Sequence, residues 1–240
     1  MYAVTLVAMY DPSLKDSLKS LEESMPVVLA AFGMQDMGTT LLDFIITYLY
    51  KFVLIVTPFI YSIVMCYRLL AKYVENGSLA YLLNSKHGRT KIVITQWVNL
   101  FLGLVVMIAF NTGLMIVCCS MMFKGSLDIP RFLLLNLGLL ALQLFIAAFC
   151  FMFACLFNDV KYSIGCGAGV ISLFIIMQMF FSVYDNAKIL LYCNPLSLFN
   201  PQQLVNGNIV SVISLVVLTG LTIAFLSIGL LGFKRKDLPL

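Results

Sequence analysis

The run LLDFIITYLYKFVLIVTPFIYSIVMCY at residues 41–67 decides the fold class, because it is longer than the roughly 20 apolar residues that cross a bilayer as a helix. Four further runs pass the same length test, at 92–123, 132–157, 164–184 and 209–233. Of the 240 residues, 62% are hydrophobic and 11% are charged, and the mean hydropathy is +1.02. Charged residues make up about a quarter of a soluble domain. We therefore predict an all-α polytopic membrane protein in which residues 1–240 form a single transmembrane domain.

The distribution of charge predicts how these spans are oriented. Basic residues follow the first complete span and close the chain, at Arg68, Lys72, Lys86, Arg89 and Lys91 and at Lys234, Arg235 and Lys236. The positive-inside rule places both clusters in the cytoplasm. The 40 residues before Leu41 contain five acidic residues and two lysines, a net charge of −3, and should lie outside.

The first ten residues, MYAVTLVAMY, are apolar but would reach only about 15 Å as a helix, half of a bilayer. We interpret residues 1–10 as the outer half of a further span. That interpretation gives six transmembrane helices, the first one truncated, with both ends of the chain cytoplasmic. An interfacial start to the chain is the alternative.

Several classes of function lack the residues that they need. A net charge of +4 gives no electrostatic basis for binding nucleic acid. The chain has no G-x-x-x-x-G-K-[ST] loop, so ATP would have to be bound by another chain. Its single histidine, His87, cannot supply the paired ligands of a metalloprotease or a membrane-embedded catalytic base. We predict no catalytic, cofactor-binding or metal site in this chain.

Polar side chains within the spans have two interpretations. Lys51, near the outer end of the first complete span, can reach the lipid headgroups, whereas a transport role for Asp43 or Lys51 is the alternative. Gly165 and Gly169 are spaced for close helix packing. Six amides could line a conduit or, as we favour, bond between helices: Gln96, Asn99, Asn111, Asn136, Gln143 and Gln178.

A polar insert, YVENGSLAYLLNSKHGRTK, occupies residues 73–91 between the first two complete spans. Gly77 can end the helix that leaves the membrane, and Ser78 can cap a new short helix. That helix would carry one apolar face, formed by Leu79, Leu82 and Leu83. Such a face fits a groove on a soluble partner, and it fits equally well against lipid or neighbouring helix ends.

This insert resembles the E-x-G-(S/T)-L-x-x-L-L-x-(S/T) pattern after the second span of ABC exporter permeases of the type-two superfamily. The stretch LLYCNPLSLFNPQQLVNG at residues 190–207 is similar to the segment between their fifth and sixth spans. The ending GFKRKDLPL is similar to their C-terminal tail, so the resemblance covers about residues 40–240. The positions that match are Glu75, Gly77, Ser78, Leu79, Leu82, Leu83 and Ser85 in the insert, with Arg89 and Lys91 after it, and Pro195, Phe199 and Pro201 in the second stretch.

The resemblance implies that residues 76–90 form a cytoplasmic coupling helix seated in an ATPase subunit, and that residues 186–207 form an extracellular re-entrant gate. The coupling residues would be Glu75, Gly77, Leu79, Leu82, Leu83 and Arg89, and the gate residues Pro195, Leu196, Phe199 and Pro201. ATP and Mg²⁺ would be bound by the cytoplasmic ABC ATPase. A second permease subunit, identical or different, would complete a dimer.

We therefore predict a multi-pass permease subunit of an ATP-driven ABC exporter in a cell membrane, of the bacterial plasma-membrane kind, with no enzymatic activity of its own. It would move a hydrophobic or amphipathic peptide, lipid or drug outward by alternating access. The alternative is a membrane scaffold or sensor subunit that anchors a soluble partner through the same helix. A secondary transporter is a third option, weakened by the scarcity of carboxylates inside the spans.

Overall fold

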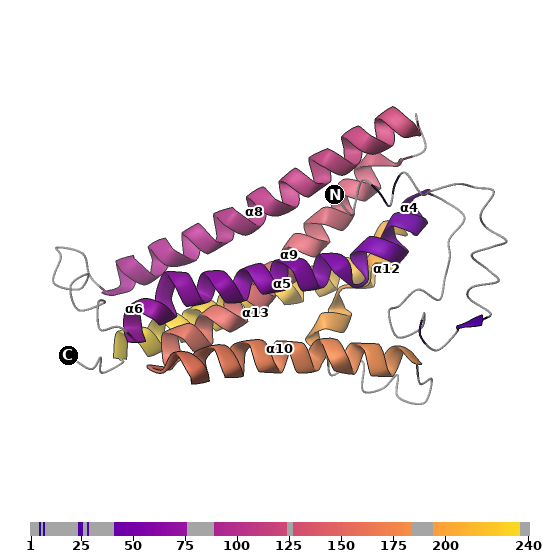
Figure 1. Cartoon of the computed structure of the whole chain (residues 1–240). Coiled ribbons are helices and arrows are strands. Elements are labelled where there is room, and N and C mark those ends of the chain that lie inside the picture. Colours follow the sequence, from indigo (N-terminus) through magenta and orange to yellow (C-terminus); the bar gives the residue numbers. More distant parts are fainter. Residues whose placement is uncertain are drawn as a thin grey trace. The chain divides into compact units, whose positions relative to one another are not determined.

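The computed structural model of the chain describes residues 41–75, 89–123, 127–183 and 194–235, together with Thr5, Val7, Ser24, Met25 and Val28. Regular structure in these residues is helical throughout (Figure 1). Five helical runs of the described chain are long and apolar enough to cross a membrane: Leu41–Val74, Thr90–Met122, Ile129–Leu156, Val160–Phe180 and Ile209–Arg235. The five complete spans predicted from the sequence are confirmed, and the first extends further than predicted, to Val74.

The other predicted elements are not tested by these helices. Residues 76–88 of the coupling region lie outside the described residues, as does most of the partial span at 1–10. The six-span topology and the coupling helix therefore stay predictions.

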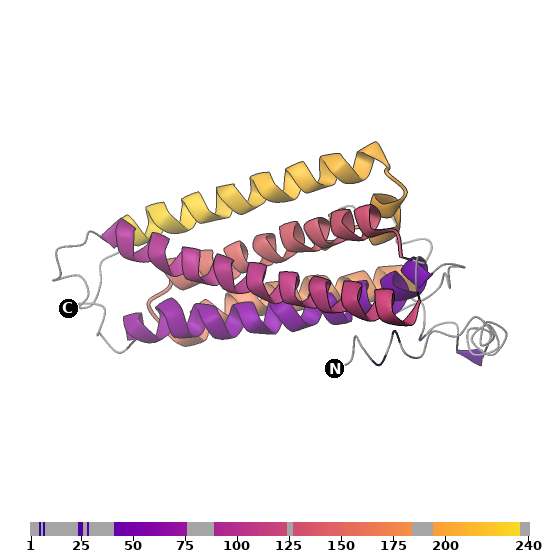
Figure 2. The ribbon, with the colours of Figure 1, turned by 90° about the horizontal axis from the view of Figure 1, so that it is seen from above.

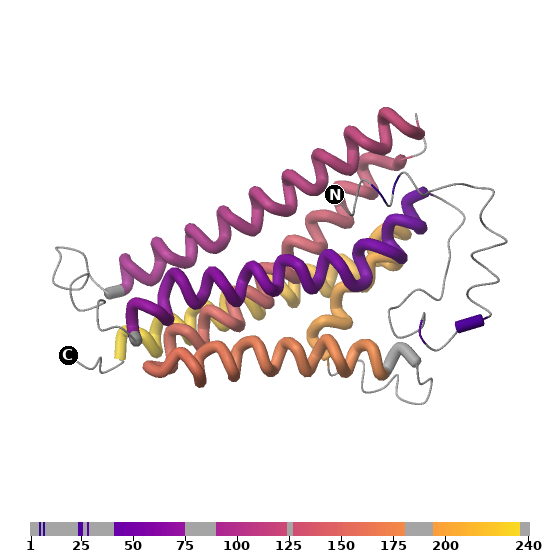
Figure 3. The backbone as a smooth tube through the Cα atoms, viewed as in Figure 1, coloured from indigo at the N-terminus to yellow at the C-terminus, as the bar shows by residue number. Residues whose placement is uncertain are grey.

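The first run is a chain of short helical pieces rather than one regular helix (Figure 3). Two of these pieces are π-helical turns, and the backbone turns again between η2 and α5. Pro58 within α5 has no N–H to donate, so one backbone hydrogen bond is missing there. Proline and π-helical turns are the usual causes of helix bending. The pieces are α4 (Leu41–Ile45), η2 (Ile46–Tyr50), α5 (Val53–Cys66), η3 (Tyr67–Ala71) and α6 (Lys72–Glu75).

The other four spans are long α-helices (Figure 2): α8 (Arg89–Met122), α9 (Ile129–Leu156), α10 (Val160–Val183) and α13 (Ile209–Arg235). Polar residues before three of them satisfy amide groups in their first turns. Asp128 accepts a hydrogen bond from the Arg131 N–H of α9, and Asp159 accepts one from the Lys161 N–H of α10. Asn208 does the same for the Val210 N–H of α13. These caps fix where the helices begin.

The chain divides into two compact units, and each of the four long helices α8, α9, α10 and α13 contributes residues to both. The first unit comprises Met1–Val56, Met107–Leu140 and Phe174–Leu215. The second comprises Thr57–Val106, Ala141–Leu173 and Val216–Leu240. α9 contributes to both units and is the most buried span, with 67% of its apolar window inside the protein against 17–39% for the other four.

Glycines allow α10 and α13 to approach α9 closely in the second unit. A Cβ atom added to Gly167 of α10 would lie 3.3 Å from the Cα of Cys150. One added to Gly229 of α13 would lie 3.2 Å from the Cα of Met152, so backbone rather than a flexible side chain limits the space. Close backbone approach of this kind is how helices associate in lipid, where apolar burial supplies little drive.

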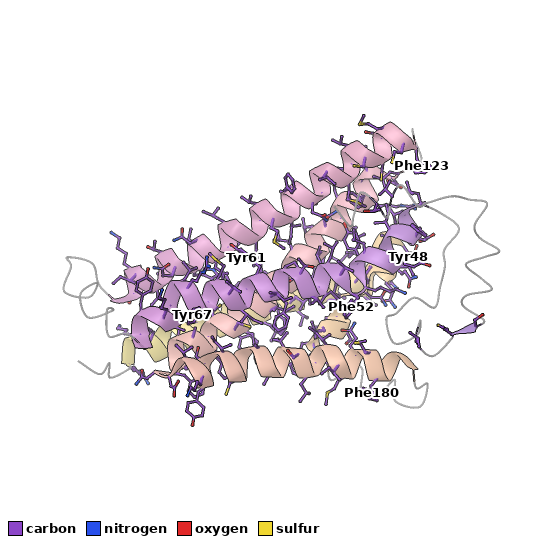
Figure 4. The ribbon with its side chains drawn as sticks, in the orientation of Figure 1. Tyr48, Phe52, Tyr61, Tyr67, Phe123 and Phe180 are labelled. Carbon is purple, nitrogen blue, oxygen red and sulfur yellow. The ribbon has the colours of Figure 1, made fainter. Side chains whose placement is uncertain are left out.

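The glycine pair singled out in the sequence does not make such a contact in the described structure. No atom lies within 4 Å of a Cβ added to Gly165 or Gly169, so it is Gly167, between them, that packs against α9. A third close contact joins α5 to α8, where Gly103 faces the hydroxyl of Tyr61, which Figure 4 labels.

Aromatic rings complete the packing of the second unit. Phe149 of α9 meets Phe225 of α13 edge to face, with ring centroids 5.2 Å apart. Trp97 of α8 meets Phe151 of α9 at 5.5 Å. Both pairs fall in the range where aromatic rings attract each other.

We predict that Gly229→Val destabilises the protein by about 1–3 kcal/mol, because the added side chain has to push α13 away from the α9 backbone. The matched control is Gly220→Val on the same helix, where nothing lies within 4 Å of the added Cβ. Thermal unfolding in detergent, followed by the reactivity of the buried thiols, should show a lower midpoint for the first variant alone. Equal midpoints would mean that α13 does not pack against α9 at this glycine.

Candidate functional site

Between α10 and α13, the described residues 194–208 form two short helices in the first unit. They are the 3₁₀ turn η5 (Pro195–Leu198) and the helix α12 (Pro201–Val205). Each is started by an asparagine followed by a proline. The Asn194 side chain accepts a hydrogen bond from the Leu196 N–H at 3.0 Å, and Asn200 accepts one from the Gln203 N–H at 3.2 Å. Proline suits the first position of a helix, where its missing N–H costs nothing.

The segment ends in a tight reversal into α13. Gly207 has a φ of +69°, a left-handed conformation that glycine adopts without strain. Its N–H donates to the Leu204 carbonyl at 3.1 Å, as at the end of many helices. Asn208 then caps α13. We call residues 194–208 the cap segment.

Apolar side chains of the cap segment are buried, and two of them lie against α9. Leu196, Phe199 and Leu204 have at most 4% of their surface exposed. A Cβ added to Gly138 of α9 would lie 2.5 Å from Leu204 Cδ2 and 3.1 Å from Phe199 Cε2. A larger residue at position 138 would therefore have to push the side chains of Leu204 and Phe199 aside.

A buried amide also ties the cap segment to α10. The Asn194 Nδ2 group donates to the Phe174 carbonyl at 2.8 Å, while the Oδ1 atom caps η5. Only 2% of Asn194 is exposed, so both bonds form away from water. Asn194 thus determines both the local turn and its position against a long helix.

A buried hydrogen bond joins the π-helical turn η2 to the same region of α9. The Tyr50 hydroxyl donates to Asn136 Oδ1 at 2.8 Å, and Asn136 Nδ2 donates to the Phe132 carbonyl at 2.8 Å. The Tyr50 and Phe132 rings meet edge to face, 6.2 Å apart. Because α12 also packs against η2, one stretch of α9, residues 132–138, contacts both η2 and the cap segment. This stretch, η2 and the cap segment form the candidate functional site.

The site is apolar, with its polar groups used in structural hydrogen bonds. The described residues contain no group of three His, Cys, Asp or Glu side chains placed to hold a metal ion. Two irregular segments of backbone, η2 and the cap segment, contact the same seven residues of the most buried helix, about two helical turns.

The structure brings together the predicted gate residues but says less about the coupling residues. Pro195, Leu196, Phe199 and Pro201 all belong to the cap segment, where the last three are buried. Glu75 ends α6 and Arg89 begins α8. Gly77, Leu79, Leu82 and Leu83 lie outside the described residues.

Among the amides inside the spans, Asn136 bonds between helices, as we favoured, whereas Asn99 is exposed. The Oε1 atom of Gln96 and the Nδ2 atom of Asn111 are buried without a hydrogen bond in the described structure. The sequence did not reveal the Tyr50–Asn136 pair or the role of Gly138. An amide and a glycine spaced two apart in an otherwise apolar helix were the available signal.

We predict that Tyr50 and Asn136 are energetically coupled. Tyr50→Phe and Asn136→Leu should each lower stability, and the double variant should lose less than their sum, with a coupling of about 1 kcal/mol as is typical of hydrogen bonds between membrane helices. Unfolding by denaturant in mixed micelles measures the cycle. Tyr67→Phe, on an exposed tyrosine of the same run, is the control and should show no coupling to Asn136→Leu. Additive losses at Tyr50 and Asn136 would rule out the bond.

Comparison with known proteins identifies the family of the chain. Residues 15–239, most of its length, match the family described as protein of unknown function DUF2705. No curated protein and no solved structure matches it. The chain therefore belongs to the DUF2705 family of proteins of unknown function.

Proposed function

We propose that this protein is the permease subunit of an ATP-driven ABC exporter in a cell membrane, of the bacterial plasma-membrane kind. The observation that carries the proposal is the match of residues 75–85 to the coupling-helix pattern, at the place in the chain where such a helix is needed. α6 ends at Glu75 and α8 begins at Arg89, and both belong to runs that are apolar and long enough to cross a membrane. Residues 76–88 therefore connect two such runs.

The cap segment supports the second half of the proposal, an extracellular gate. Two helices of four and five residues are too short to cross a bilayer, and Phe199 and Leu204 pack against α9. In our proposal the cap segment closes the exit and moves with η2 when the outer half opens. The π-helical turns and Pro58 are the points where the first run would bend.

The proposed cargo is hydrophobic or amphipathic, such as a peptide, lipid or drug. Within the first complete span the described charges are Asp43 and Lys51 near its start and Arg68 and Lys72 near its end. Ion-coupled transporters use charged groups near the middle of the membrane, and none is described there in this span. ATP and Mg²⁺ would be bound by the ATPase subunits, and a second permease subunit would complete the conduit.

The direct test replaces two leucines of the coupling region. Leu82→Asp/Leu83→Asp should abolish co-purification of the ATPase, because each buried leucine contributes about 1.5–3 kcal/mol and the pair corresponds to well over 100-fold in affinity. The control is Leu82→Met/Leu83→Met, which keeps the apolar volume. The aspartate variant should still insert, since no span is altered.

Two outcomes of that test count against the proposal. Wild-type ATPase binding by the aspartate variant would mean that the leucine face rests on lipid or on its own subunit. A partner that is lost from the variant but has no nucleotide-binding loop would identify the chain as a scaffold or sensor subunit.

A second prediction concerns the gate. Leu196→Trp should impair export at least about tenfold, because the Leu196 side chain is completely buried and a larger ring would displace the cap segment. ATPase assembly should be unchanged, since the two sites are separate in the proposal. Gln203→Trp, on the exposed side of α12, is the matched control. Loss of the ATPase from the Leu196 variant would place the cap segment on the cytoplasmic side.

A further inference from the structure

Six basic side chains of the second unit are exposed at helix termini: Arg68, Lys72, Lys91, Lys161, Lys234 and Arg235. Among the described side chains of this unit, Asp159 is the only acidic one, and its carboxylate caps α10. The ion pair that the structure does describe, Arg131 with Asp128, belongs to the first unit. The described side chains of this unit therefore carry a clear excess of positive charge.

These cations gather at one end of the second unit. α6 and α13 finish there, and α8 and α10 begin there, in both views of the ribbon (Figures 1 and 2). Packing contacts agree: Gly232, three residues before Arg235, contacts Leu156 at the end of α9. The hairpin from α9 to α10 brings Lys161 to the same place. We call the six residues the cationic collar.

Three cations of the collar continue exposed apolar stripes of their own helices. On α8, Lys91 is followed by Ile94, Val98 and Leu102, which are 43–51% exposed and share its face at helical spacing. On α13, Arg235 follows Leu231, one turn earlier, which is 59% exposed. On α5 and η3, Arg68 follows Ile60 and Val64, which are 55% and 43% exposed. Apolar side chains this exposed on membrane helices contact lipid tails, so the cations lie at the level of the headgroups.

Tyrosines mark the same level. Tyr162, beside Lys161, is 64% exposed, and Tyr67, beside Arg68, is 36% exposed. Tyrosine is enriched where a membrane helix leaves the hydrocarbon, because its ring is apolar and its hydroxyl is polar. α8 has 34 residues, about 51 Å of helix, which exceeds the hydrocarbon thickness and brings its first turn into the headgroup layer.

We propose that the cationic collar binds the headgroups of anionic phospholipids. A soluble partner would contact the ends of the helices, whereas these cations lie on the sides of the helices, in line with the apolar side chains that contact lipid tails. Anionic headgroups supply the complementary charge at that level, and each lysine or arginine near such a surface raises affinity about fivefold. The collar then holds an anionic lipid shell around the second unit. This inference rests on the membrane embedding of the helices and not on the exporter proposal.

Trp97 provides the probe, because it is the only tryptophan of the chain and lies on α8 about 9 Å along the helix from Lys91. The purified full-length chain is placed in bilayers that contain either dibrominated phosphatidylglycerol or dibrominated phosphatidylcholine. Quenching of Trp97 fluorescence by the bromine atoms then reports which lipid occupies the neighbouring sites. We expect the anionic lipid to be preferred about fivefold, and less so at high salt, since salt screens exposed charges.

Variants separate the collar from a general preference for anionic lipid. Lys91→Gln/Lys161→Gln should clearly lower the preference, because two of the six cations are removed, while quenching by the brominated phosphatidylcholine stays at the wild-type level and confirms the fold. The matched control is Arg131→Gln, which removes a cation of the first unit that already pairs with Asp128. It should keep the full preference.

Two results would overturn the inference. Equal quenching of the wild-type chain by the two lipids would show that the collar does not select anionic headgroups. A preference that survives Lys91→Gln/Lys161→Gln unchanged would place the lipid selectivity elsewhere. Failure of either kind leaves the ATPase co-purification test untouched, so the two proposals can fail separately.

Discussion

Close packing around α9 is the constraint on which the rest of the structure depends. In a bilayer, burial of apolar side chains gives little net attraction between helices, because lipid tails are as apolar as leucine. The helices must instead associate through close backbone contacts and hydrogen bonds between helices. α9 provides both, since Gly167 and Gly229 approach its backbone in the second unit and Asn136 bonds to Tyr50 in the first.

The same helix positions the candidate site. Residues 132–138 contact a π-helical turn on one side and the cap segment on the other, and each contact depends on one small or polar residue. Asn136 holds η2 by accepting a hydrogen bond from the Tyr50 hydroxyl, and Gly138 leaves room for the side chains of Leu204 and Phe199 in the cap segment. Two irregular segments are thus positioned by neighbouring residues of one helix.

Much of the fold could be predicted from the sequence because membrane spans follow from length and apolarity alone. The five complete spans were found within a few residues at most boundaries, and Pro195 and Pro201, next to an apolar stretch too short to cross a bilayer, indicated a segment that is not a span.

The details of packing could not be found in the same way. Gly165 and Gly169 had the favoured spacing, yet Gly167 makes the contact, because helix rotation rather than spacing decides which face meets α9. The π-helical turn at Ile46–Tyr50 likewise left no sign in the sequence, since it depends on packing against α9 and α12.

The central claim is that this chain is the membrane half of an ATP-driven machine. The most direct measurement is single-particle electron microscopy of the protein purified with its partners from native membranes. The account predicts a particle with two permease subunits and two nucleotide-binding subunits, whose grooves receive residues 76–90. A particle without a nucleotide-binding subunit, or one whose soluble partner contacts only the opposite end of the helices, would contradict it.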